Sequence, residues 1–107
     1  MPKYLLQASY TADGLKGLQK DKASGRRGVL SQAVETLGGK LEAFYFAFGD
    51  SDVYVIVELP DRQAAAALAM TVARAGRVAK IETVVLLTAD ELDEALKRQV
   101  TYRAPGQ

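Results

Sequence analysis

The chain contains no cysteine and no histidine among its 107 residues. Without cysteine it can form no disulfide, no thiolate nucleophile and no Cys-based zinc or iron–sulfur site. Without histidine it lacks the commonest general base, the commonest transition-metal ligand and the usual haem ligand, although a tyrosine haem ligand stays open. We therefore expect no metal site and no cofactor. Any proton transfer would have to use Asp, Glu, Tyr, Lys or bound water.

The chain also lacks an excess of charge and a long apolar run. Its formal net charge is +1, which provides no concentrated positive field for nucleic acid or an anionic membrane. The longest uncharged run, Gln63 to Ala73, is far shorter than the ~20 residues that span a bilayer. The N-terminal segment MPKYLLQASY has too short an apolar run for a signal peptide. We therefore expect a cytoplasmic protein with neither a nucleic-acid nor a membrane partner.

The most informative stretch that is present runs from Lys40 to Pro60. Two runs rich in aromatic and β-branched residues flank a short polar loop, Gly49 to Asp52. Such side chains fit a pleated, half-buried surface, and Gly, Asp and Ser are typical turn residues. This stretch predicts a central β-hairpin.

Strand and helix patterns alternate in a regular order around this hairpin. Lys3–Tyr10 and Lys80–Leu87 have the composition and alternation of strands. Helical spacing predicts a first helical region that begins with Thr11 as its N-cap and ends at Gly38, with a break over Lys22–Gly25. A second helix is predicted over Arg62–Ala75, where alanines give strong helix propensity and Asp61 can cap the start.

A short last helix is predicted to begin at Thr88, because Thr88 and Glu91 have the spacing of a capping box, and to run to about Arg98. The whole order, β-α-β-β-α-β plus a terminal helix, is that of an α+β, ferredoxin-like fold. We expect a single domain over residues 1–107, with a core at 3–87, a C-terminal helix at 88–98 and a tail at 99–107.

Both faces of the predicted sheet are apolar, while two helices can cover only one of them. On the second strand, Leu41, Ala43 and Tyr45 lie opposite Phe44 and Phe46. A monomer would expose a larger apolar patch than soluble proteins usually carry. We therefore expect a homodimer or higher oligomer. The alternative is that the last helix and the tail fold back over the open face.

With its elements in this order, the chain resembles the GYD domain family, a branch of the dimeric α+β barrel proteins. The resemblance runs from about Lys3 to Leu87. The family's Gly-x-Tyr-Asp type signature corresponds here to residues 49–52, with Ser51 at the tyrosine position. The other matching features are the first strand with Thr11, Arg26-Arg27, Gly38-Gly39-Lys40, Tyr45 to Asp52, Leu59-Pro60-Asp61, and the Ala-rich helix with Gly76.

The resemblance implies the barrel fold, dimerisation, and a cavity between sheet and helices. Relatives in the wider superfamily bind small organic molecules or haem in such a cavity. No established activity comes with the family.

Several polar residues lie on otherwise apolar strands and are candidates for contacts with a ligand. Gln7 and Ser9 point to the same face of the first strand, and Tyr45 and Tyr54 lie on the hairpin. Buried polar groups need partners, so these residues mark either a ligand pocket or structural hydrogen bonds. Asp52 is a further candidate, with hydrogen bonding to turn amides as the alternative.

Two adjacent arginines, Arg26 and Arg27, form the last candidate group. Adjacent residues diverge by about 100° on a helix, so at most one of the two faces a cleft. Arg27 best matches the basic position of the family, so the resemblance makes it the ligand-binding candidate. An arginine can hold a carboxylate by two parallel hydrogen bonds, or it can be structural or merely solvated.

These observations favour a small homo-oligomeric protein that binds a small organic molecule in its cavity. The residues do not decide whether it is an enzyme; a lyase, an isomerase and a cofactor-independent oxygenase all stay open. The alternative is a non-enzymatic ligand sensor or oligomeric assembly module. The ligand-binding candidates are Gln7, Ser9, Arg27, Tyr45, Asp52 and Tyr54.

Overall fold

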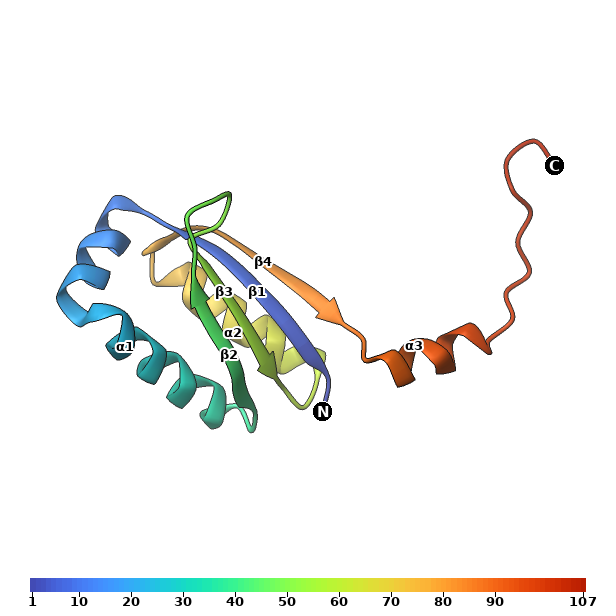
Figure 1. The fold of residues 1–107 in the computed structure, drawn as a ribbon, viewed down its shortest axis with the longest axis horizontal. Helices are drawn as coiled ribbons and strands as arrows, with labels where there is room; N and C mark the ends of the chain where they lie inside the picture. Colours follow the sequence, from blue (N-terminus) through green and yellow to red (C-terminus); the bar gives the residue numbers. More distant parts are fainter.

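The computed structural model describes all residues from 1 to 107. Its elements occur in the order β-α-β-β-α-β-α, which confirms the predicted ferredoxin-like α+β fold (Figure 1). They are β1 (Lys3–Tyr10), α1 (Ala12–Thr36), β2 (Lys40–Phe46), β3 (Val53–Glu58), α2 (Arg62–Arg74), β4 (Val78–Leu86) and α3 (Ala89–Leu96).

The four strands form one antiparallel sheet in the order β2-β3-β1-β4. The first strand is therefore central and pairs with both β3 and β4. Within it, alternate residues Tyr4, Leu6 and Ala8 are buried, whereas Leu5 and Gln7 are only partly covered. This alternation results from the two-residue period of a strand, and it shows that one face carries the core.

The core lies between that face and the two long helices. Val57 and Leu59 from the β3 region and Val34 from α1 are fully buried, and Leu68 and Ala65 of α2 pack with them. The small alanines of α2 let this helix lie close to the sheet. No buried polar side chain is present in this core.

The second strand departs from the predicted alternation. Its register against β3 shifts between Leu41 and Ala43, so Glu42 is an extra, bulged residue. As a result Leu41 pairs with Val57 and packs on the core together with Phe44. The sequence prediction placed Leu41 on the face of Ala43 and Tyr45, and that was wrong because a bulge inverts the alternation beyond it. The exposed Glu42 carboxylate pairs with Lys3.

The helix starts agree with the predicted capping residues. The hydroxyl of Thr11 accepts a hydrogen bond from the Gly14 N–H at 3.0 Å. The Asp61 carboxylate accepts one from the Ala64 N–H at 2.8 Å. Thr88 forms the predicted capping box of α3 with Glu91. All three predicted caps are therefore confirmed.

The first helical region is broken as predicted, at Lys22. This residue has φ 66° and ψ 162°, outside the helical region, within the 25-residue span of α1. The chain changes direction here. The residues after Lys22 therefore turn a different set of side chains towards the sheet than an unbroken helix would.

The other face of the sheet is not covered by any element of the chain. Tyr45 on this face is 70% exposed, and Leu5, Tyr54 and Ile56 are only partly buried. Figure 1 shows α3 and the tail extending away from the sheet rather than folding back over it. The radius of gyration is 16.8 Å, whereas a compact chain of this length has about 13 Å. No helix is both long and apolar enough to cross a membrane.

Candidate functional site

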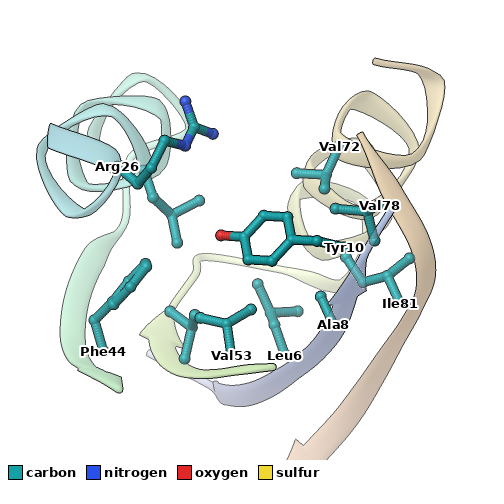
Figure 2. Close-up of a pocket in the computed structure, with 11 residues that line it drawn as sticks. Leu6, Ala8, Tyr10, Arg26, Phe44, Val53, Val72, Val78 and Ile81 are labelled. Carbon is teal, nitrogen blue, oxygen red and sulfur yellow. The ribbon is translucent and has the colours of Figure 1, made fainter. Parts of the chain in front are cut away.

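An apolar cavity lies between the sheet and the two long helices. Figure 2 shows α1 and α2 on the same side of the curved sheet, with the lining side chains in the space between the helices and the sheet. Ten of its eleven lining residues are hydrophobic, and Arg26 is the one charged residue. The lining residues are Leu6, Ala8, Tyr10, Arg26, Leu30, Phe44, Val53, Val55, Val72, Val78 and Ile81.

The cavity continues into a groove between α1 and α2. The groove has a volume of about 410 Å³. It shares five lining residues with the cavity, namely Tyr10, Arg26, Leu30, Val72 and Val78. Because the cavity and the groove share these lining residues, they form one site, which we name the cleft.

Tyr10 occupies the junction of the cavity and the groove. It is the last residue of β1 and comes after Tyr4, Leu6 and Ala8 on the face that carries the core. Figure 2 shows its hydroxyl directed toward α1. Burial raises the pKa of the Tyr10 phenol above its ordinary value, while the nearby Arg26 guanidinium acts in the opposite direction. The phenol is therefore neutral at physiological pH and can donate a hydrogen bond.

Arg26 enters the cleft from the segment of α1 beyond the break. Its Nη1 lies 3.6 Å from Oδ2 of Asp21. Residues five apart on an unbroken helix point in directions about 140° apart, so they do not normally meet. The non-helical conformation of Lys22 between them allows this contact. Both side chains are partly exposed, so this ion pair is weak and its charge remains accessible.

Asp52 and Ser9 have structural partners near one end of the cleft. Oδ2 of Asp52 accepts a hydrogen bond from the Tyr10 N–H at 2.8 Å. The Asp52 N–H donates to the Ala8 carbonyl, also at 2.8 Å. The Ser9 hydroxyl donates to the Asp50 carbonyl at 3.1 Å. These bonds attach the hairpin loop to the end of β1 and hold Tyr10 in place.

Three other predicted ligand contacts lie together on the open face of the sheet. Gln7 pairs with Tyr54, and Tyr54 pairs with Tyr45, so the three form a row across β1, β3 and β2. This row is on the opposite side of the sheet from the cleft. Arg27 is exposed on α1 and does not line the cleft.

None of the six candidate residues therefore lines the cleft, and their role in ligand binding stays a prediction. Sequence reasoning did not select Tyr10 and Arg26, the two polar groups that line both the cavity and the groove, and the groove adds Asp21, Thr71 and Arg77. A signal for Arg26 was present, because Arg26, Leu30 and Ala33 have the i, i+4, i+7 spacing of one helix face. Tyr10 likewise continues the alternation of the buried residues in β1.

The cleft can hold an apolar body and one polar or acidic group. Arg26 supplies a positive charge and Tyr10 a hydrogen-bond donor, and both lie beside hydrophobic walls. No group of three or more acidic side chains comes together in a way that could hold a metal ion. The cavity thus offers apolar contact and one charged side chain, Arg26, and the groove adds the charged side chains of Asp21 and Arg77.

The fold and the cleft together define a small ferredoxin-like α+β protein with one helical layer and one open sheet face. The sequence profile of the GYD domain matches residues 4–96. The chain belongs to the GYD domain family, which is part of the dimeric α+β barrel superfamily. Comparisons with curated proteins and with solved structures gave no significant match.

Proposed function

We propose that this protein binds a small, largely apolar organic molecule carrying one acidic group, and that the binding site is the cleft. The observation that carries this proposal is the lining of the cavity, where Arg26 is the single charged residue among eleven. An apolar ligand gains roughly 25 cal/mol for each Å² of apolar surface removed from water. The guanidinium would then select ligands with a carboxylate or a similar anion.

The dimensions of the cleft support a ligand of metabolite size. Its groove measures about 410 Å³, within the ~300–1,000 Å³ range of small-molecule sites, and the apolar cavity that adjoins the groove measures about 80 Å³. Tyr10 supports the same proposal, because a neutral phenol next to Arg26 adds a hydrogen-bond donor for the acidic group.

The experiment is a thermal-shift and calorimetric screen with aromatic and aliphatic carboxylic acids, each compared with its neutral amide. We expect some acids to raise the melting temperature and their amides to do so less, because only the acids pair with Arg26. Arg26→Gln should remove the preference for the acid. Arg27→Gln is the matched control, since Arg27 is adjacent, exposed and outside the cleft. If no acid stabilises the protein, or if Arg27→Gln has the same effect as Arg26→Gln, the proposal is wrong.

A second candidate function, assembly through self-association, is favoured by the open face of the sheet. Leu5, Ile56 and Val84 lie on this face with Tyr45 and Tyr54, and no part of the chain covers them. We propose that two copies pack these faces together as a homodimer. A monomeric mass by native mass spectrometry or sedimentation at micromolar concentration would contradict it. The cytoplasmic location expected from the sequence stays a prediction.

A further inference from the structure

The last twenty residues, Thr88 to Gln107, form a segment that has almost no contact with the rest of the chain. We name it the C-terminal arm. Every residue of the arm except Ala104 is exposed. Figure 1 shows it projecting from the end of β4, on the opposite side of the molecule from α1. The family match includes its helix, since the match extends to residue 96.

The arm carries apolar side chains that are exposed to solvent. Leu92, Leu96, Val100 and Tyr102 are 48%, 75%, 82% and 76% exposed, respectively. Leu92 and Leu96 are four residues apart and lie on one face of α3, and Val100 follows beyond the end of the helix. An isolated helix of this length is marginal in water even with a good capping box. Packing against another surface would therefore stabilise the helix of the arm and remove its apolar side chains from water.

The size of the uncovered surface indicates that the missing partner is a protein. The accessible surface is 7797 Å², whereas a compact monomer of 11.5 kDa exposes about 5,800 Å². The excess of about 2,000 Å² is larger than the ~800 Å² that each partner contributes to a standard protein interface. A partner that covers both the arm and the open sheet face would bury an area of this order.

The charge of the arm indicates which surface it contacts. Its helix, α3, carries four acidic residues (Asp90, Glu91, Asp93 and Glu94) and no basic one. This charge opposes adsorption to an anionic membrane. Residues 16–27 of α1 carry five basic residues and only one acidic residue, Asp21. Exposed apolar side chains, Leu15 and Val29, flank this basic stretch.

We infer that the C-terminal arm of one copy packs on α1 of a second copy of this chain, and that the exchange is reciprocal. The complementary surface must come from a second copy because α1 and α3 of one chain lie at opposite ends of the molecule. The acidic side of α3 pairs with the basic side chains of α1, and Leu92 and Leu96 contact the exposed apolar ones. This inference rests on the self-association proposed above and adds a second contact to it.

Two charge-reversed variants test the contact. Variant A carries Asp90→Lys, Asp93→Lys and Glu94→Lys on α3, and variant B carries Lys16→Glu, Lys20→Glu and Lys22→Glu on α1. All six residues are exposed and outside the lining of the cleft, so both chains should fold. In dimers of A alone or B alone, both arm contacts become repulsive. We expect each dissociation constant to rise roughly tenfold or more at low salt, and less at high salt.

Mixing A with B distinguishes an arm that packs on a second copy from an arm that folds back on its own chain. In the A–B heterodimer, each arm meets an α1 of opposite charge. Native mass spectrometry should therefore show more heterodimer than random pairing of the two chains gives. No preference for the heterodimer, or unchanged association of A and of B, would overturn the inference.

A chain truncated after Leu87 distinguishes failure of the arm contact from failure of the proposed dimer. If self-association is wrong, the full-length protein is itself a monomer. If only the arm contact is wrong, the truncated chain dimerises as tightly as the full-length chain. Hydrogen exchange tests whether the arm packs instead on its own chain or on a lipid membrane. Protection of the arm in a monomer, or only on phosphatidylcholine vesicles, would also overturn the inference.

Discussion

The backbone N–H of Tyr10 donates a hydrogen bond to Oδ2 of Asp52 across 2.8 Å. This bond connects the last residue of the central strand to the end of the hairpin loop, forty-two residues further along the chain. The same aspartate donates its own N–H to Ala8. Asp52 therefore holds the backbone from which the Tyr10 ring enters the cleft.

The first prediction concerns the loss of this contact. Asp52→Ala should lower the free energy of unfolding by about 1–3 kcal/mol, because a partly buried backbone N–H loses a charged acceptor. Asp50→Ala is the matched control in the same loop. There only the backbone carbonyl takes part in a hydrogen bond, and that carbonyl is kept. Urea denaturation of both variants measures the difference, and equal losses would contradict the assigned role.

The second prediction concerns the close approach of α1 to the start of β4. A Cβ at Gly14 would lie 2.0 Å from the carbonyl oxygen of Arg77. That carbonyl is held in place because it accepts the Thr11 N–H at 3.0 Å. Gly14→Ala should therefore force the helix away from the sheet and destabilise the fold by about 2 kcal/mol or more.

Gly17→Ala provides the contrast in the same helix. No atom lies within 4 Å of a Cβ placed at Gly17, and alanine in a helix is favoured over glycine by roughly 1 kcal/mol. Its melting temperature should rise while that of Gly14→Ala falls. Two shifts of the same sign would show that packing at Arg77 does not decide the outcome.

The sequence was sufficient for the order of elements, because strand alternation, capping residues and helix-ending glycines are local signals. It was insufficient where one local irregularity changes the phase of the neighbouring residues. The bulge at Glu42 moved Leu41 to the core side of the sheet. The choice of Arg27 came from the family resemblance, whereas the helical spacing of Arg26, Leu30 and Ala33 points to Arg26, the arginine that lines the cleft.

The candidate site was harder to predict than the fold because it depends on contacts between distant segments. Gln7 and Tyr54 were correctly placed on strands, but polarity alone does not say which face of the sheet borders a cavity. Ser9 and Asp52 carry polar groups that the hairpin loop and β1 use between themselves. Only the packing of α1 and α2 on one face places Tyr10 and Arg26 where they line both the cavity and the groove.

The third prediction concerns stability at alkaline pH. Burial raises the pKa of Tyr10 in the folded protein above its unfolded value, which is near 10. The folded state therefore keeps this proton where the unfolded state loses it. The contribution is fully present below the unfolded pKa and is lost as pH rises through the folded pKa. Stability should fall from about pH 10 upward, and Tyr10→Phe should remove part of that fall.

The measurement is the free energy of unfolding of both proteins from neutral to alkaline pH. Lys3 and Lys80 have raised pKa values too, each mainly through a hydrogen bond to a nearby glutamate, Glu42 and Glu82 respectively. They contribute to the same alkaline loss in both proteins, so the difference between the two curves isolates Tyr10. A constant difference across this pH range would contradict the raised pKa of Tyr10.

The fourth prediction concerns Asp21, which competes with an acidic ligand for Arg26. The two side chains lie 3.6 Å apart and are partly exposed. Asp21→Asn removes this competing charge while it keeps the shape of the side chain. The affinity for a carboxylic acid that binds in the cleft should rise by up to roughly fivefold at low salt, since an exposed pair of this kind contributes up to about 1 kcal/mol.

Calorimetric titration with that acid measures the change in affinity. Two control variants show whether the change depends on the pair of Asp21 and Arg26. Glu35→Gln removes a carboxylate from the far end of the same helix, outside the cleft, and should leave the affinity nearly unchanged. In an Arg26→Gln background, Asp21→Asn should give no increase in affinity, because the guanidinium that pairs with Asp21 is absent. An increase that persists without Arg26 would mean that Asp21 acts on the ligand by long-range repulsion. The acid would then be held by some group other than the guanidinium.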